Sequence, residues 1–210
     1  MIHTIFQQLL DTLLPPPEPV RQCRALTTAN LDTLYAPTIR SGTVALLPIA
    51  KPSVRALIHA NKFYRDSHAC YLLGYTLSLY LQPLLLQHPV TLLPIPLGAT
   101  RERERGHNQV MSILTALPNI LAPDHISIAN SLLRRTRETP MQSHLNRTDR
   151  LKNVADCFAV NQKDAPLETP LHLILIDDVV TTGATLGAAA QALRPHLPPG
   201  ATLSLLALAY

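Results

Sequence analysis

Residues 173–187, LILIDDVVTTGATLG, place four bulky aliphatic side chains directly before two adjacent carboxylates. A short, continuous apolar run is typical of a parallel strand that is buried on both faces between layers of helix. Residues 90–95 form a second run of this kind, and segments with helical periodicity alternate with such runs. This alternation predicts an α/β fold with a mostly parallel sheet flanked by helices, in a doubly wound, Rossmann-like arrangement.

Hydrophobic periodicity and turn residues place the remaining elements. Helices are expected near residues 2–14, 52–60, 67–82, 106–116, 146–153 and 184–194. Strands are expected near residues 43–48, 90–95, 126–129, 171–176 and 202–208. The proline-rich segments 15–19, 117–123 and 161–170 are interpreted as loops rather than as linkers between domains.

The composition indicates a globular protein that binds anions. The chain has 210 residues, of which 47% are hydrophobic, so it can bury a sizeable core. Its net charge is +4, and much of the arginine lies in two segments, 101–105 and 134–150, which create local anion sites. Phosphates are therefore the first ligands to consider. Three cysteines that are far apart, with no C-x-x-C pair, argue against a disulfide framework and a zinc ribbon and fit a reducing cytoplasm.

One segment is long enough to cross a membrane. Residues 71–100 contain no Asp, Glu, Lys or Arg. Prolines interrupt this segment repeatedly, and Gln82, Gln87 and His88 would place polar groups near its middle, where they are costly. We therefore expect no membrane insertion. The N-terminal segment lacks a basic leader, and its apolar spacing predicts a docking helix over 2–14 that ends before Pro15.

The acid pair is expected at the carboxyl end of its strand, where open α/β sheets bind ligands. Two interpretations of Asp177 and Asp178 are open. The first is turn and capping chemistry, in which Thr181 or Thr182 bonds the first amides of the following helix. The second is an anion site, in which Gly183 lets the backbone turn tightly so that amide groups and the helix N-terminus face a phosphate.

The second interpretation also indicates the ligand. Hydroxyl donors for the phosphate would come from Thr181, Thr182 and Thr185, and the two carboxylates lie behind them as acceptors for a diol. A phosphate beside paired hydroxyls describes a ribose 5-phosphate. A strand that ends in two aspartates also resembles the magnesium-binding strand of P-loop NTPases. None of the seven glycines, however, begins the G-x-x-x-x-G-K-[ST] loop that those enzymes need.

The segment LILIDDVVTTGATL closely resembles the motif with which type I phosphoribosyltransferases bind phosphoribosyl diphosphate (PRPP). Further blocks are similar to the ComF family of phosphoribosyltransferase-like competence proteins. They are PIPLGATRERERGHNQ at 94–109, VRALIHANKFYRD at 54–66 with Lys62 and Phe63, and matching positions at Arg135, Arg137, Thr139, Pro140, Gln142, Leu145, Arg150, Asn153, Val154 and Phe158. The resemblance runs from about residue 52 to the end of the chain.

This resemblance implies a type I phosphoribosyltransferase-like domain over residues 51–210, preceded by a short helical cap over residues 1–50. It also implies a site that binds PRPP together with Mg²⁺ bridged by the substrate, with no separate protein metal site. The implied ligand-binding residues are Asp177, Asp178, Thr181, Thr182, Gly183, Ala184, Thr185, Arg101, Arg103 and Arg105. The implied catalytic residues are Asp177, Asp178, Arg135 and Arg137.

Both arginine segments also have a plainer interpretation. Residues 101–105, RERER, could form a solvated turn of weak surface ion pairs. Their position after strand 90–95 instead favours guanidinium groups that bind a diphosphate. Residues 134–150 could be an ordinary surface loop, or the mobile loop that closes over the site in related transferases.

Two positions depart from the family pattern. Members commonly begin with a four-cysteine zinc module, whereas only Cys23 stands in that region here, so we expect no bound zinc and a substitute cap. His107 replaces the usual aromatic residue, and we expect it to be a packed or solvated side chain rather than a functional group.

The favoured function is transfer of a phosphoribosyl group to an acceptor that no residue identifies. The family is associated with DNA uptake in transformable bacteria. A second hypothesis is a non-catalytic PRPP sensor or assembly factor that binds a helicase-like partner. A third is direct binding of single-stranded DNA along the arginine segments, which the low aromatic content of 4% makes weaker. The general base and the oligomeric state are left open.

Overall fold

A computed structural model describes residues 16–117, 120–121, 125–137, 157–161 and 172–210. The helices expected near 2–14 and 146–153 lie outside these residues. No helix within the described ranges is both long enough and apolar enough to cross a membrane.

The centre of the molecule is a six-stranded sheet in the order β1-β2-β8-β7-β3-β4. Its strands are β1 (Thr38–Arg40), β2 (Thr43–Leu47), β3 (Val90–Pro94), β4 (Ile126–Ile128), β7 (His172–Val179) and β8 (Thr202–Ala209). Only β1 pairs antiparallel, with β2, and every other neighbouring pair is parallel. The predicted mostly parallel α/β sheet is therefore confirmed.

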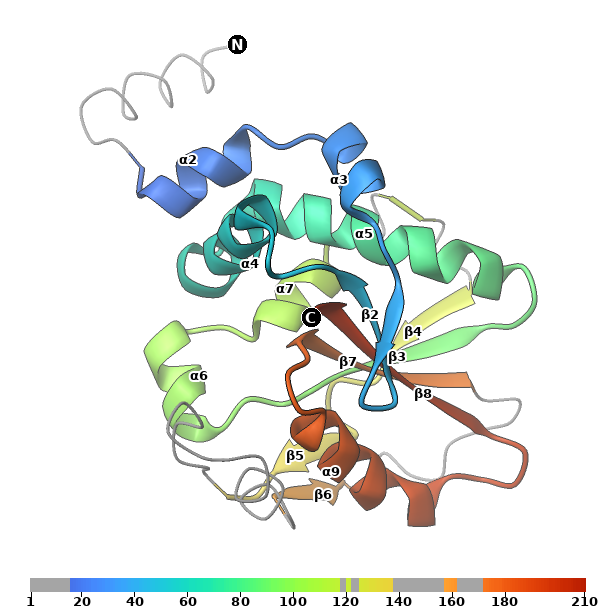
Figure 1. Ribbon diagram of the computed structural model, residues 1–210. Helices are drawn as coiled ribbons and strands as arrows, with labels where there is room; N and C mark the ends of the chain where they lie inside the picture. The colour runs from blue at the N-terminus through green and yellow to red at the C-terminus, as the bar shows by residue number, and fades with distance from the viewer. Residues whose placement is uncertain (1–15, 118–119, 122–124, 138–156, 162–171) are drawn as a thin grey trace.

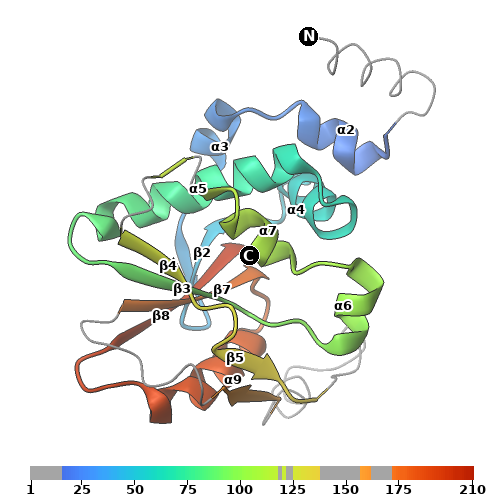
Figure 2. The same ribbon diagram turned by 180° about the vertical axis from the view of Figure 1, so that it is seen from behind.

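Helices and a small second sheet cover the two faces of the main sheet (Figures 1 and 2). On one face lie α4 (Pro52–Tyr64), α5 (Ser67–Leu85) and α7 (Gln109–Leu114), and α2 (Glu18–Arg24) and α3 (Thr28–Leu34) pack outside them against α4 and α5. The other layer holds α9 (Ala184–Leu193), which continues into a short 3-10 turn at Arg194–His196, and the antiparallel pair β5 (Leu133–Arg135) and β6 (Phe158–Val160).

The alternating side chains of β7 show why this strand is apolar throughout its first half. Leu173 and Leu175 pack in the core beneath α9, whereas Ile174 and Ile176 pack in the core beneath α4, α5 and α7. All four side chains are completely buried. A strand with a helix layer on each face has no polar side, as the continuous apolar run predicted.

Helices α4 and α5 meet at a sharp bend. Pro52 starts α4, a position where the missing amide proton is not needed, and Arg65 ends the helix in the left-handed conformation. The Asp66 carboxylate then caps α5 by accepting a hydrogen bond from the Ala69 amide at 2.9 Å. This bend fixes the C-terminal end of α4, which carries Lys62 and Phe63.

Most expected elements occur close to their predicted positions, and three differ in an informative way. Residues 99–105 form a helix, α6 (Ala99–Arg105), where neither a helix nor a strand was predicted. The second arginine segment does not start as a loop, because Arg134 and Arg135 belong to β5 and pair with Ala159 and Phe158. Strand β7 extends through both aspartates to Val179, since Asp177 pairs with Ala207 and Val179 with Ala209 on β8.

The strand order produces a crevice between β3 and β7. The chain leaves β3 through α6 and α7 and returns to the sheet at β4, on the far side of β3 from β7. It leaves β7 through α9, on the opposite face, and returns at β8, on the far side of β7 from β3. Where adjacent strands connect in opposite directions in this way, the space beyond their carboxyl ends is open to a ligand.

The described part of the predicted cap, residues 16–50, contains α2, α3 and the β1–β2 hairpin. Its last strand, β2, pairs with β8 and is part of the main sheet. The division at residue 50 stays a prediction. Cys23 on α2 is completely buried in the core next to α4 and α5, as an apolar side chain would be.

Candidate functional site

The two aspartates face opposite sides of the sheet because successive side chains of a strand alternate. Asp178 follows Ile174 and Ile176 toward α4 and α7, and only 6% of its surface is exposed. Asp177 faces the other side and is partly exposed. One oxygen of the Asp177 carboxylate accepts a hydrogen bond from the Asp178 amide at 2.8 Å. The adjacent acids are therefore in different environments.

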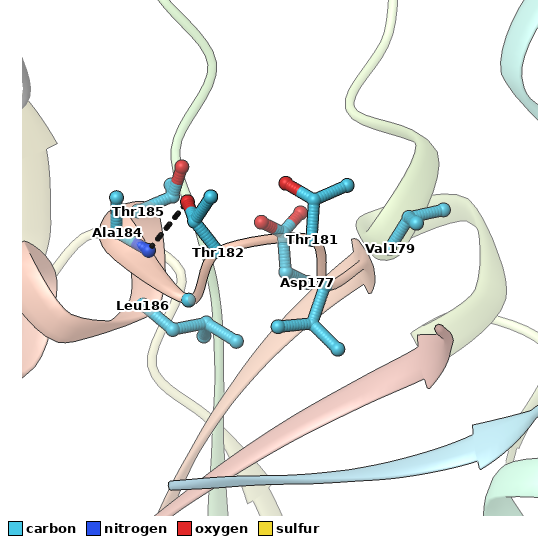
Figure 3. A pocket seen from close by; sticks show the side chains of 9 residues that line it. Asp177, Val179, Thr181, Thr182, Ala184, Thr185 and Leu186 are labelled. Carbon is cyan, nitrogen blue, oxygen red and sulfur yellow. Dashed lines mark hydrogen bonds between the residues drawn. The ribbon is translucent and has the colours of Figure 1, made fainter. Parts of the chain in front are cut away.

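Beyond β7 the chain forms a tight loop before α9. The Val180 amide still bonds the Ala209 carbonyl at 2.9 Å, and Gly183 then adopts the left-handed conformation with φ of 74° at the start of the helix. The loop surrounds a small open hollow of about 20 Å³, which we call the loop pocket, lined by Asp177 and residues 179–186. Figure 3 shows the side chains of Asp177, Thr181, Thr182 and Thr185 around it.

The loop contains elements of both interpretations of the sequence. The Thr182 hydroxyl accepts a long hydrogen bond of 3.4 Å from the Ala184 amide, so a threonine does contribute to capping (Figure 3). Gly183, the residue that precedes the helix, has no side chain with which to bond its first amides. The loop thus combines threonine hydroxyls with a helix N-terminus, the combination that binds anions.

Glycine is required at position 183 for two reasons. The left-handed backbone conformation strains any residue with a Cβ. A Cβ at this position would also lie 2.8 Å from Ser41 Cβ and 3.1 Å from the Ser41 carbonyl oxygen, in the β1–β2 turn. The turn between β1 and β2 therefore packs closely against the loop that forms the loop pocket.

A larger hollow of about 310 Å³, which we call the main cleft, adjoins the loop pocket. The two share Asp177, Val179, Thr181 and Thr185. Elements from four parts of the chain supply the rest of the main cleft, which is lined by Lys62, Ile95, Pro96, Leu97, Arg101, Arg105, Gln109, Arg135 and Asp178. The main cleft lies at the crevice between β3 and β7, as the strand order predicts.

The structure brings most of the predicted site residues to these two hollows. Thr182, Gly183 and Ala184 line the loop pocket, and Arg101, Arg105, Arg135 and Asp178 line the main cleft. Two predicted residues lie elsewhere. Arg103 is exposed on α6, where its Nε donates to the Ala99 carbonyl at 3.3 Å, and Arg137 is 3.6 Å from the Cys157 sulfur. The predicted roles of these two arginines stay predictions.

Asp178 is the centre of a polar network that joins three elements. Its Oδ2 accepts a hydrogen bond from Gln109 Nε2 at 3.1 Å and lies 3.5 Å from Lys62 Nζ. The Gln109 side chain in turn accepts a hydrogen bond from the Arg105 guanidinium at 3.1 Å. The buried Asn61 amide donates to the Gln109 carbonyl at 3.3 Å and so ties α7 to α4.

The charges of the site shift each other's titration. Although part of the Asp177 residue is exposed, its carboxyl group is largely removed from water, and this desolvation, followed by the neighbouring Asp178 carboxylate, raises the pKa of Asp177 to about 8, while Lys62 acts in the opposite direction. Burial also lowers the pKa of Arg105, which remains a cation at neutral pH. Hydrogen-bond donors or a cation supplied by a ligand would therefore stabilise the ionised form of Asp177.

Lys62 and Gln109 were not among the predicted site residues. Each lies in a segment that resembles the family pattern, Lys62 in ANKFY and Gln109 in GHNQ. This resemblance was the one signal in the sequence that could have identified them as site residues. Their proximity to Asp178 is a tertiary contact across more than sixty residues of sequence in each case, which a local pattern does not reveal.

His107 is packed as expected. Its Nδ1 lies 2.8 Å from the Arg105 carbonyl and its Nε2 lies 3.2 Å from the Asn61 carbonyl. The ring therefore links α4 to the segment between α6 and α7, and only a doubly protonated imidazole could donate to both carbonyls.

Asp177 and Asp178 could contribute oxygen ligands to a magnesium ion that enters with a ligand. Within the described ranges, no three His, Cys, Asp or Glu side chains come together to hold a metal ion. Of the residues that the structure describes, Asp177 and Asp178 are the carboxylates that line the main cleft, and Asp178 is already engaged by Lys62 and Gln109. The donor set agrees with the usual behaviour of Mg²⁺, which keeps waters and binds one or two carboxylates plus phosphate oxygens.

No protein-family model matches the chain. Comparison with known proteins finds relatives that are named for DNA utilization or for competence. The DNA utilization protein YhgH of Salmonella typhimurium is 32% identical over 149 residues, which cover 68% of this chain and 61% of that protein. Competence protein F of Haemophilus influenzae is 32% identical over 52% of this chain and 46% of its own length. Competence protein ComFC of Bacillus subtilis is 37% identical over 49% of this chain and 37% of its own length. The chain therefore spans less than two thirds of the length of these relatives.

Proposed function

Because the chain belongs to the ComF family, we propose that it binds PRPP with Mg²⁺ and transfers the phosphoribosyl group to an acceptor, in a process of DNA uptake or utilization. The names of the relatives, DNA utilization protein and competence protein, support the process. The site itself supports the ligand and the reaction class.

The observation that carries the proposal is the order of groups along the two adjoining hollows. The loop pocket offers threonine hydroxyls and a helix N-terminus, which suit a terminal phosphate. Asp177 lies where the loop pocket meets the main cleft and suits ribose hydroxyls. Lys62, Arg101 and Arg105 in the main cleft suit a diphosphate. Phosphate, ribose and diphosphate follow one another in PRPP in this order.

The proposed reaction is a substitution at C1 of the ribose. A nucleophilic atom of the acceptor attacks C1, the bond from C1 to the diphosphate oxygen breaks, and its electron pair leaves with the diphosphate. The acceptor atom loses its proton if it carries one. Bond breaking ahead of bond formation would give the ribose oxocarbenium character, as in glycoside cleavage.

The residues of this chain would act by positioning and by electrostatics. Asp177 would accept hydrogen bonds from the ribose hydroxyls and hold the ring. Arg101 and Arg105 would neutralise charge that develops on the departing diphosphate. Mg²⁺, when it enters with the substrate, supplies further positive charge to the same oxygens.

Calorimetric titration with PRPP and Mg²⁺ tests binding. Asp177→Asn should weaken PRPP binding at least tenfold, because a carboxylate that accepts hydroxyl hydrogen bonds contributes about 1.5–3 kcal/mol. The matched control is Asp32→Asn, an exposed acid on α3 whose Oδ1 accepts a hydrogen bond from the Tyr75 hydroxyl. No saturable binding at millimolar PRPP, or equal affinity in wild type and Asp177→Asn, contradicts the proposed ligand site.

A second candidate function is supported by the relatives' names, which describe DNA utilization and competence rather than a transferase. In this case PRPP binding would regulate contacts with a helicase-like partner or with single-stranded DNA instead of supplying a substrate. Release of diphosphate from PRPP with candidate acceptors decides between the two. Saturable PRPP binding without diphosphate release, combined with a PRPP-dependent change in DNA affinity, would favour the regulatory role.

A further inference from the structure

Asp178 and Asp177 are adjacent in sequence but differ in what they can still bind. Both oxygens of Asp178 are engaged: Oδ1 accepts the Val179 amide at 2.8 Å, and Oδ2 faces Gln109 Nε2 at 3.1 Å and Lys62 Nζ at 3.5 Å. The side chain is buried, with 6% of the residue exposed. Asp177 is partly exposed and lines both hollows. A pair of equivalent ribose acceptors does not fit this arrangement.

Lys62 is placed to bind an anion. Its ammonium has three donors, of which one direction is taken by Asp178, and its side chain is 27% exposed and lines the main cleft. The exposed ring of the neighbouring Phe63 lies 6.0 Å from Lys62 Nζ and 5.7 Å from the Arg105 guanidinium. Lys62 and Arg105 therefore approach the main cleft from one side of it.

Asp178 organises both of these cations. It holds Lys62 directly, and it holds Arg105 through Gln109, whose amide donates to Asp178 while its carbonyl oxygen accepts from Arg105. Among the described residues, those that line the main cleft include four cations, Lys62, Arg101, Arg105 and Arg135, against two carboxylates. This excess of positive charge matches an anion with several charges rather than a neutral sugar.

We propose that the two carboxylates have different tasks: Asp177 binds the ribose hydroxyls, whereas Asp178 is a positioning residue that holds Lys62 against the diphosphate group of PRPP. Lys62 is thus a further substrate-binding residue. The assignment rests on the proposed PRPP site, and it divides the ligand into a part that Lys62 contacts, the diphosphate, and a part that it does not, the ribose 5-phosphate.

The test compares the affinities of two probes, PRPP and ribose 5-phosphate, each with Mg²⁺. Lys62→Met keeps the length of the side chain and removes its charge. It should weaken PRPP binding about tenfold or more and leave ribose 5-phosphate binding within about twofold, because only PRPP carries the diphosphate. Asp177→Asn should weaken both probes. Lys51→Met, at the exposed N-terminal end of the same helix, is the matched control and should change neither.

Asp178→Asn should resemble Lys62→Met, with a selective loss of PRPP affinity. The double variant should lose little more than either single variant, since the two side chains act as one unit. Lys62→Arg should recover most of the PRPP affinity by restoring the charge. Thermal unfolding of each variant shows that it is folded, and Lys62→Met decides the question alone if Asp178→Asn does not fold.

Three results overturn the assignment. Lys62→Met that weakens both probes equally, or neither, shows that Lys62 does not contact the diphosphate. Asp178→Asn that weakens ribose 5-phosphate as Asp177→Asn does shows that Asp178 is itself a ribose ligand. If the wild-type protein binds neither probe, the proposed function fails and this assignment fails with it. That outcome differs from the first two, in which wild-type binding persists.

Discussion

Alanine substitution at Gly183 should be among the most destabilising single changes in the loop, and the structure separates its two causes. The left-handed conformation at φ of 74° costs a residue with a Cβ roughly 1–2 kcal/mol. The new Cβ would also lie 2.8 Å from Ser41 Cβ and 3.1 Å from the Ser41 carbonyl. Overpacking of this kind typically adds about 1–3 kcal/mol. We expect Gly183→Ala to lower the free energy of unfolding by about 2–5 kcal/mol.

Two other glycines provide controls. Gly106 has a similar φ of 68°, but a Cβ there meets no atom within 4 Å, so Gly106→Ala should show the conformational cost alone, about 1–2 kcal/mol. Gly187 lies in the exposed face of α9 with open space around it, and Gly187→Ala should stabilise the protein by about 0.5–1 kcal/mol through helix propensity.

Urea unfolding of the wild type and the three variants measures these differences. For a chain of this size, each kcal/mol also corresponds to about 2–4 °C in Tm. Ser41→Gly in the Gly183→Ala background should recover part of the loss, because it removes the Cβ contact but leaves the carbonyl contact. If Gly183→Ala costs no more than Gly106→Ala, the close approach of the β1–β2 turn to the loop pocket is not a real constraint, and the reasoning is refuted.

Further predictions concern titration, thiol reactivity and the arginines of α6. The pKa of Asp177 is raised in the folded protein, so folding favours its protonated form, and the resulting stability is present at low pH and lost as the pH rises through about 8. Asp177→Asn should therefore gain Tm over the wild type progressively between about pH 5 and pH 8, and a constant Tm difference across this range would contradict the shift. Burial raises the pKa of Cys23 to about 12 and that of Cys70 to about 11, so neither thiol should react with a disulfide reagent at about pH 8 until urea unfolds the protein; rapid labelling of either in the native state would show that it is accessible. Arg101→Ala should weaken PRPP binding about tenfold, whereas Arg103→Ala on the exposed side of α6 should change it less than twofold, and equal losses in calorimetric titration would mean that α6 presents both guanidinium groups to the ligand.

The sequence was sufficient for the strands β2, β3, β4, β7 and β8, although not for β1, and for the loop that follows β7, because these depend on local patterns. A continuous apolar run marks a doubly buried strand, and Gly183 among threonines marks a tight turn before a helix. Helix α6 was not predicted, although its own residues carry the signals of a short helix: Glu102 in the first turn, Arg103 and Arg105 in the last, and Gly106 in the left-handed conformation after it. These helix signals were not decisive, because the alternation of positive and negative charges in RERER is equally typical of a solvated turn.

Other parts of the molecule depend on contacts that local patterns do not show. Strands β5 and β6 have three residues each, and each is a strand only because it pairs with the other. The different environments of Asp177 and Asp178 arise from what lies on each face of β7, in particular from Lys62 on α4 and Gln109 on α7. Two adjacent identical residues look equivalent in a sequence, and only the packing of distant helices makes them unequal.

The position of β8 in the sheet has a consequence for how the chain reaches its native state. β8 lies between β2 and β7, and Val44 on β2 pairs with Leu206 on β8, 162 residues later (206 − 44). During synthesis, β2 therefore cannot pair with β8 until nearly the whole chain has been made. Until then, β1 is the strand of the sheet that can pair with β2. Pairing over such a separation slows folding and leaves an apolar strand edge open to other chains in the meantime. We therefore expect the yield of folded protein to depend more on chaperones or on a low temperature during synthesis than on the stability of the finished core.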